Sequence, residues 1–297
     1  MNEVPVLREQ RLEDIHGYIF RMPSLSTTVT KTLEICNNPN SSPHELSRVI
    51  SLDPVLTGQL LKLVNSAYYS LSNKVPSLTR AIIMLGLNTV KNLVLSIAIL
   101  DSLGGKKAFR ALSPNDFWTH SICTGVVAKS LAAAKGIPLA DQEEYFVAGL
   151  LHDLGKIPLN SCFPDEYSLA LESAGSKQDS LHQAENRVFG MDHCGVGKMI
   201  AEKWQLGRTI IDSLLHHHDP DAAGEKTRRF VAVIAMSNFF ANFFKIGFAG
   251  NNCFDETVAE HLAGQIELSW ASLSGLIDVV SDDIEKARIF LQLTKKG

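Results

Sequence analysis

The stretch GLLHDLGK, residues 149–156, holds side chains suited to chemistry rather than to packing alone. An apolar run leads straight into His152 and Asp153, a neutral base beside a carboxylate, and Lys156 follows one turn later. Imidazole nitrogen and carboxylate oxygen together suit a transition metal, and a carboxylate can bridge two such ions. The same residues could instead form a satisfied polar cluster, so the other histidines have to be considered.

Further histidines lie at positions from which helices could point them into the interior of the protein. His120 shares an apolar helical face with the residues four, seven and eleven positions later. His193 lies in the first turn of a helix that Asp192 can cap, and the run His216-His217-His218 ends another helix. Four helices therefore each bring imidazole to an end or a buried face. This favours a site for one or two ions of iron, manganese, zinc or nickel.

Such ions would clamp the oxygens of a phosphate ester, and Lys156 could neutralise or protonate a leaving oxygen. Each residue also has a simpler interpretation. A lone histidine on an apolar stripe, such as His120, is usually a satisfied core residue. The sequence HHHDP could be a solvated helix terminus, where imidazolium meets the negative end of the helix dipole. Lys156 after Gly155 could be a terminal charge for the same reason.

The sequence around these residues predicts helices, and patterns typical of strands are almost absent. Helix starts are indicated by a capping residue followed by proline at Ser42-Pro43, Asp53-Pro54 and Ser113-Pro114. Asp141, with Glu144 three residues later, predicts the start of the helix that delivers His152. We therefore expect an all-α fold.

The chain is most readily divided between Asp101 and Pro114, where Gly104-Gly105-Lys106-Lys107 interrupts the helical pattern. We expect a two-part helical bundle divided there. Residues 1–110 would form an N-terminal helical half. Residues 111–297 would form a second half that carries the histidine cluster and further helices at its C-terminal end.

Composition narrows the class of protein. Hydrophobic residues make up 45% of the chain and charged residues 20%, which is ordinary globular usage. The net charge of -4 gives no bulk attraction to nucleic acid or to an anionic membrane. The five cysteines are scattered with no CxxC, which suits reduced thiols and argues against a disulfide framework or a cysteine-based zinc site. With no signal peptide visible, we expect a cytoplasmic protein.

Two segments could suggest other partners. The apolar window at residues 230–249 contains several polar side chains, so a buried helix is favoured over a membrane span. Residues 80–92 resemble a helix-turn-helix with Gly86 at the turn. The second helix, residues 88–100, is apolar apart from Lys91 and lacks the side chains that read DNA. We expect it to be buried between the two halves, which argues against nucleic-acid binding.

These residues resemble a known family. HDLGK, with a histidine on the preceding helix and more downstream, is similar to the HD phosphohydrolase superfamily, and the N-terminal half narrows this to the HDOD family of bacterial signalling proteins. The resemblance covers roughly residues 20–245. The matching segments are MPSLSTTVTKTLEI (22–35), ELSRVISLDPVLTGQLLKLVNSAYYS (45–70), VPSLTRAIIMLGLNTVKNLVL (75–95), DHCGVGKMIAEKWQLG (192–207) and HHDP (217–220).

The resemblance implies an all-α signal-transduction output or scaffold module that acts through a protein partner. The alternative that it implies is a metal-dependent phosphohydrolase acting on a nucleotide or other small phosphoester. Lys156 and Asp153 would be catalytic only in the second case. The metal ligands that the resemblance implies, together with a nearby glutamate, are His120, His152, Asp153, His193, His217, His218 and Glu185, with His216 an extra histidine.

Two departures from the superfamily pattern matter. The last metal ligand of the superfamily is an aspartate on a late helix, and the matching position here is Asn238. An amide oxygen is a weaker, uncharged ligand, which affects one of the two metal positions. The second departure is that the residues after His218 contain no DGxGYP. Hydrolysis of cyclic-di-GMP of the HD-GYP kind is therefore unsupported.

Overall fold

The computed structural model describes residues 3–103, 109–176, 179–251, 256–268, 273 and 275–294. Over these residues the chain is helical and contains no strand, which confirms the all-α prediction. The helices are α1 (Glu3–Arg21), α2 (Thr27–Asn37), α3 (Pro43–Ile50), α4 (Pro54–Val64), α5 (Leu78–Leu85), α6 (Leu87–Leu103), α7 (Pro114–Ala134), α8 (Leu139–Leu151), α9 (Lys156–Cys162), α10 (Pro164–Ser176), α11 (Leu181–Phe189), α12 (His193–Lys203), α13 (Arg208–His216), the 3-10 turn η2 (Pro220–Ala222), α14 (Glu225–Phe243), α15 (Glu256–Gln265), α17 (Ile277–Ala287) and α18 (Ile289–Thr294).

Capping residues begin several helices where the sequence predicts. The side chains of Ser42, Asp53 and Ser113 each accept a hydrogen bond from a backbone N–H three residues later, and proline follows each of them at the first helical position. Asp192 caps α12 in the same way, which places His193 at the first helical position. Capping side chains thus set the starts of α7 and α12, the helices that carry His120 and His193.

One predicted start is wrong. The helix expected to begin at Asp141 begins at Leu139, with Pro138 before it and no side-chain cap. Asp141 lies in the first turn instead, where its Oδ1 accepts a hydrogen bond from Asn88 Nδ2 at 3.4 Å. Pro138 already presets the first turn, so the helix needs no capping carboxylate.

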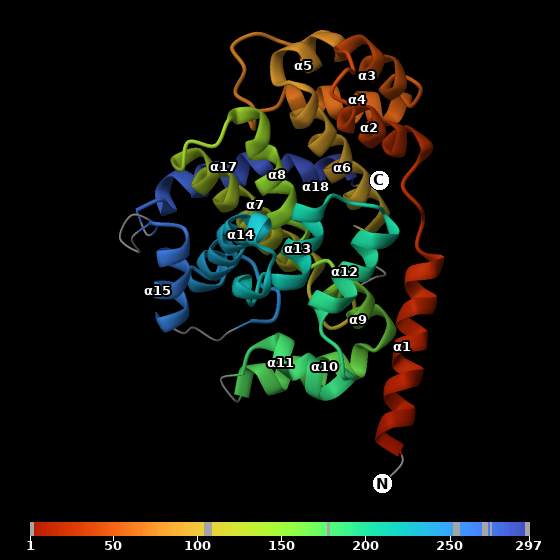
Figure 1. Cartoon of the computed structure of the whole chain (residues 1–297), viewed down its shortest axis with the longest axis vertical. Helices are drawn as coiled ribbons and strands as arrows, with labels where there is room; N and C mark the ends of the chain where they lie inside the picture. The colour runs from red at the N-terminus through yellow and green to blue at the C-terminus, as the bar shows by residue number, and fades with distance from the viewer. Residues whose placement is uncertain are drawn as a thin grey trace.

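The helices are arranged around a central group made of α7, α8, α13 and α14 (Figure 1). Helices α2 to α5 lie at one end of the molecule, α10 and α11 lie at the other, and α1 runs along one side. Helix α1 packs on α9 and α12, whereas α18 packs on α4 and α6. The division into 1–110 and 111–297 stays a prediction, and the interruption at Gly104 to Lys107 lies outside the described residues.

Helix α6 is buried, as the sequence predicts. It follows α5 across a bend of 118° at Gly86, whose φ is +86°. It packs against α2, α4, α5, α8 and α18, and Lys91, its one basic residue, is half-buried. A DNA-reading face is therefore absent from this described helix. Among the described residues no single helix is long and apolar enough to cross a membrane; the bent α5–α6 pair passes by length and composition only.

Two glycines allow α7 and α8 to cross closely. A Cβ on Gly149 would lie 2.7 Å from the Cα and the backbone nitrogen of Gly125, closer than any side chain tolerates. Because neither residue has a Cβ, the two backbones touch. The crossing brings the rings of His120 on α7 and His152 after α8 to a centroid distance of 5.4 Å.

Helix α12 is fixed at its C-terminal end. Lys203 Nζ donates hydrogen bonds to the carbonyl oxygens of Ile19, Phe20 and Met22 at 2.6, 2.9 and 2.7 Å. Ile19 and Phe20 lie in the last turn of α1, and Met22 follows the helix. Trp204 Nε1 donates to Pro23 O at 3.1 Å. The last carbonyl groups of an α-helix have no partner within the helix, and here the Lys203 ammonium group satisfies those at the end of α1.

Candidate metal centre

Histidine side chains from four helices meet at one buried place. His120 comes from α7, and His152 and Asp153 follow the end of α8. His193 begins α12, and His217 follows α13. All five side chains are at most 2% exposed. The structure therefore brings together the ligand set that the sequence predicts, although the role of each residue as a metal ligand stays a prediction.

Backbone carbonyls fix which ring nitrogen of two histidines faces inward. His152 Nδ1 lies 2.7 Å from Gly149 O, and His217 Nδ1 lies 3.0 Å from Ser213 O. A carbonyl oxygen can only accept, so Nδ1 carries a proton in both rings and Nε2 is the nitrogen that faces inward. Both Nε2 atoms point toward the Asp153 carboxylate, at 3.3 Å for His152 and 3.7 Å for His217.

The carboxylate of Asp153 lies between two groups of imidazole nitrogens. Its Oδ2 is 3.7 Å from His120 Nε2 and 3.3 Å from His152 Nε2. Its Oδ1 is 3.3 Å from His193 Nε2 and 3.7 Å from His217 Nε2. A carboxylate placed in this way could hold two metal ions, one on each oxygen.

Several of these polar atoms are buried without a hydrogen bond. Asp153 Oδ1, His152 Nε2 and both ring nitrogens of His120 lack a partner within the described part of the chain. A lone pair facing a carboxylate is repulsive, and an unsatisfied buried polar atom costs about 1–3 kcal/mol. A cation among these atoms would satisfy Asp153 Oδ1, His152 Nε2 and one nitrogen of His120. The residues present therefore fit a divalent transition metal.

The protonation states also suit metal binding. Burial lowers the pKa of His120 to about 3 and lowers the pKa values of His193 and His217 well below the usual value. Burial raises the pKa of Asp153, but His152, Lys156 and His193 more than offset it, so the pKa lies well below the usual range. Near neutral pH these groups are neutral imidazoles and a carboxylate, which are the forms that bind metals.

Lys156 has a defined position beside Asp153. Its Nζ donates to Asp153 Oδ2 at 2.7 Å and to Ala249 O at 2.8 Å, and the side chain is fully buried. The ammonium group neutralises a carboxylate that would otherwise be isolated in the core. Its predicted role as a proton donor to a leaving group stays a prediction.

Glu185 contacts His193 at the ring nitrogen that faces away from Asp153. Its Oε2 accepts from the backbone N–H of His193 at 2.8 Å and lies 2.5 Å from His193 Nδ1, while its Oε1 accepts from Tyr167 Oη at 3.0 Å. Burial raises the pKa of Glu185 to about 8. A carboxylate that bonds the outer nitrogen of a metal-binding histidine fixes the orientation of the ring. Both oxygens face His193 and Tyr167 in this arrangement.

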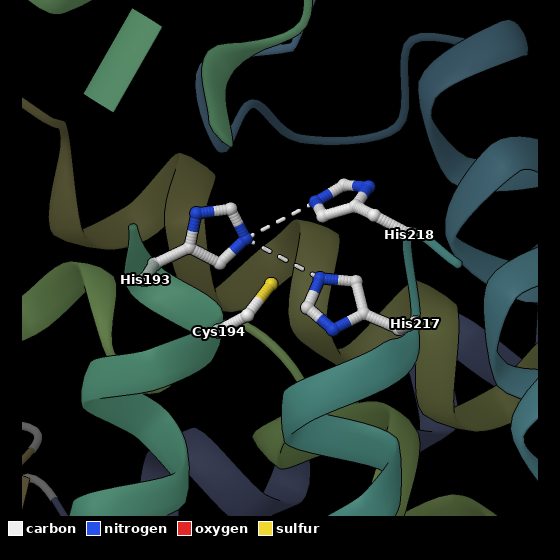
Figure 2. A group of neighbouring side chains, drawn as sticks. All are labelled: His193, Cys194, His217 and His218. Carbon is white, nitrogen blue, oxygen red and sulfur yellow. Dashed lines mark hydrogen bonds between the residues drawn. The ribbon is translucent and has the colours of Figure 1, made fainter. Parts of the chain in front are cut away.

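A second cluster extends from His193. His193 Nε2 lies 3.3 Å from His217 Nε2 and 3.1 Å from His218 Nε2 (Figure 2). Cys194 adds its thiol, and the ligand atoms of these four residues all lie within 4.8 Å of one another. Burial raises the pKa of the Cys194 thiol well above its usual value, so the group is neutral without a metal. The described cysteines, including Cys194, are free thiols.

A cleft of about 640 Å³ opens onto this cluster. His217, His218 and Asn238 line its inner part, and His182, Asp221 and His261 also line it. The volume is typical of sites for small molecules. Asn238, which replaces the superfamily aspartate, is 5% exposed, and its Oδ1 accepts a hydrogen bond from Asn242 Nδ2 at 2.9 Å.

Sequence reasoning missed two residues here. Cys194 follows a predicted ligand directly, and no spacing rule distinguishes a thiol that faces the site from one that packs in the core. His182 stacks on His218 with ring centroids 4.3 Å apart, and it is on α11, the helix from which the sequence analysis had named only Glu185. Only the fold shows that these helix ends meet.

Comparisons with known proteins give one family match and two curated relatives. A family model for the HDOD domain matches residues 22–220. An uncharacterized protein of Treponema pallidum (strain Nichols) is 26% identical over 238 residues, which is 78% of this chain and 43% of that protein. Ribonuclease Y of Mycoplasma mycoides is 28% identical over 155 residues, which is 52% of this chain and 29% of that protein. The chain thus spans less than half the length of these curated relatives.

A solved structure has the same fold over nearly the whole chain. The crystal structure of an HDOD domain protein with unknown function from Geobacter sulfurreducens is 27% identical. It matches with a TM-score of 0.74 and covers 94% of this chain and 98% of its own. The architecture described above is therefore shared with a protein determined by experiment.

Proposed function

The chain belongs to the HDOD domain family, and from that premise we propose that it is a bacterial signalling output module built around a divalent-metal centre. The observation that carries the proposal is the position of the Asp153 carboxylate. Its two oxygens face two separate groups of imidazole nitrogens, at 3.3–3.7 Å, and Oδ1 has no hydrogen-bond partner among the described residues. A metal-free core gains nothing from such an arrangement.

We infer two metal positions that share Asp153. The first would be held by His120 and His152, with the amide oxygen of Asn238 as a weak addition. The second would be held by His193, His217 and His218, with Glu185 orienting His193. Imidazole and carboxylate donors suit iron, manganese, zinc or nickel better than calcium or magnesium. One or two ions would bind, because Asn238 weakens the first position.

The signalling part of the proposal rests on the family. A module of this kind acts through a protein partner, and the charge of -4 gives no general affinity for nucleic acid or anionic lipid. We propose that the loaded centre fixes the relative positions of α7, α8, α12 and α13, and that a partner recognises that arrangement.

The test is metal content, measured by mass spectrometry on protein purified without a polyhistidine tag or chelator. One or two transition-metal ions per chain are expected, and Asp153→Ala should lose them. Asp116→Ala is the matched control, because it removes an exposed carboxylate one turn before His120 on the same helix. A wild-type protein that takes up no transition metal after incubation with each ion would refute the proposal.

A second candidate function is hydrolysis of a phosphoester, and the cleft favours it. The cleft gives a small molecule access to His217 and His218. Bound ions would supply Lewis-acid chemistry toward a phosphate oxygen. The described walls of the cleft contain neither lysine nor arginine, so the ions would have to provide most of the positive charge for a phosphate. The Mycoplasma relative is named a ribonuclease, which suggests phosphodiesters among the substrates to test.

The assay for this candidate uses metal-loaded protein with nitrophenyl phosphodiesters, nucleotides and a short RNA. Hydrolysis should disappear in Asp153→Ala and persist in Asp116→Ala. A fully loaded protein without turnover on any of these classes would count against hydrolysis and leave the metal-centred signalling module in place.

A further inference from the structure

Cys194 turns its thiol into the space between His193 and His217 (Figure 2). Its Sγ and the ring nitrogens of His193, His217 and His218 lie within 4.8 Å of one another. The side chain is 5% exposed, and Asp153 Oδ1, 3.3 Å from His193 Nε2, is buried nearby without a hydrogen-bond partner in the described chain. The thiol thus faces a group of imidazole nitrogens, close to an unsatisfied carboxylate oxygen, rather than a purely apolar core.

The spacing of the three imidazoles already matches a small ion. Zinc–nitrogen bonds of about 2.0–2.1 Å place neighbouring nitrogens of a tetrahedron about 3.3–3.4 Å apart. The Nε2 atom of His193 lies 3.3 Å from that of His217 and 3.1 Å from that of His218. Two nitrogen–nitrogen distances are therefore close to those around a tetrahedral ion, and Cys194 Sγ lies within 4.8 Å of a ring nitrogen of each histidine.

We propose that Cys194 is a further ligand of the second metal position, which would then hold a zinc ion with three histidines, one cysteine and the shared Asp153. The inference rests on the proposed metal centre and adds a ligand that the family resemblance does not supply. Cys194 binds as a thiolate and releases its proton to solvent. The thiolate also supplies negative charge near an ion that three neutral imidazoles leave uncompensated.

Two consequences follow for the chemistry of the centre. A soft sulfur donor selects zinc over manganese or magnesium at this position. A zinc ion whose ligands all come from the protein has no open place, which is typical of structural sites, whereas catalytic sites keep one place open. The second position would then hold α12 and α13 together, and any open ligand place would belong to the first position, beside Asn238.

The test replaces zinc with Co²⁺, whose visible and near-ultraviolet spectrum reports its ligands. Wild-type protein titrated with Co²⁺ should show a thiolate-to-cobalt charge-transfer band. Cys194→Ser should lose that band and bind the ion at least about tenfold more weakly. Cys162→Ser is the matched control, because this half-buried cysteine on α9 is a free thiol that is not part of the cluster. It should keep the band.

X-ray absorption of the zinc-loaded wild-type protein tests the same point without a variant. A sulfur neighbour at about 2.3 Å is expected. Zinc bound by nitrogen and oxygen alone, or a cobalt band that survives in Cys194→Ser, would overturn the inference while leaving the metal centre intact. Failure of the wild-type protein to bind either ion would instead overturn the proposed function, and the inference with it.

Discussion

Replacing Gly155 by alanine should damage one metal position more than the other. Gly155 precedes α9 and lies against the backbone of α12, with an ordinary φ of -65°. A Cβ there would lie 1.9 Å from His193 O and 2.5 Å from Gly197 N. Glycine is therefore needed here because a side chain has no room, and not because of the backbone conformation, which any L-residue could adopt.

The size of the effect follows from these distances. Real Cβ atoms essentially never approach a heavy atom closer than 3.0 Å, so α9 and α12 must separate by at least 1.1 Å at this contact. Metal–ligand distances tolerate shifts of about 0.2 Å, so His193 would leave the second position. The first position, on α7 and α8, has no residue at this contact. We expect a loss of about 3 kcal/mol in stability, the upper end of typical overpacking.

The assay combines metal titration with urea unfolding, both compared with Gly58→Ala. Gly58 is exposed on α4, and a Cβ there meets nothing within 4 Å. The control should gain roughly 0.5–1 kcal/mol from the higher helix propensity of alanine and bind metal normally. A Gly155→Ala protein with wild-type stability and wild-type affinity for every ion would refute the packing argument.

Three further predictions concern single side chains. Lys156→Met leaves the buried Asp153 carboxylate without its cation, so the metal-free protein should lose about 3–5 kcal/mol in urea unfolding, and added zinc should recover most of it; an equal loss with and without zinc would argue against an ion at Asp153. Asn238→Asp restores a charged ligand and should tighten metal binding about tenfold, or about 1.4 kcal/mol, in calorimetry; unchanged or weaker binding would place Asn238 outside the ligand set. Burial raises the pKa of the Cys36 thiol to about 11. Its alkylation, followed by peptide mass spectrometry, should therefore be about 200-fold slower at pH 8 than for a thiol of pKa 8.5, and should rise about tenfold per pH unit to pH 10. A plateau below pH 9 in the folded protein would contradict this.

Much of the helix pattern can be predicted because it depends on neighbours in sequence. Ser42, Asp53 and Ser113 reveal helix starts through a bond that spans three residues. Asp141 shows the limit of such reasoning. Its carboxylate had two possible partners, the helix end or a side chain from another element, and only the packing of α6 against α8 places Asn88 within reach.

The histidines of the site could be named from sequence because their type and the family pattern are distinctive. Their geometry could not, since it depends on how closely the helices approach. The contact of Gly125 with Gly149 and that of Gly155 with His193 set the distances in the cluster. Cys194 was missed for the same reason. Cys194 matters because its thiol points toward the histidines, and that direction follows from the packing of α12 and not from the spacing of cysteines.

Helix α12 joins two places that are far apart. His193, its first residue, lies in the metal cluster, and Lys203, its last, bonds to three carbonyls at the end of α1. Eleven residues of α-helix span about 16 Å and compress very little. A shift of His193 along this axis would therefore be carried by the helix to the end of α1. The indole of Trp204, bonded to Pro23, lies where its fluorescence would report that movement.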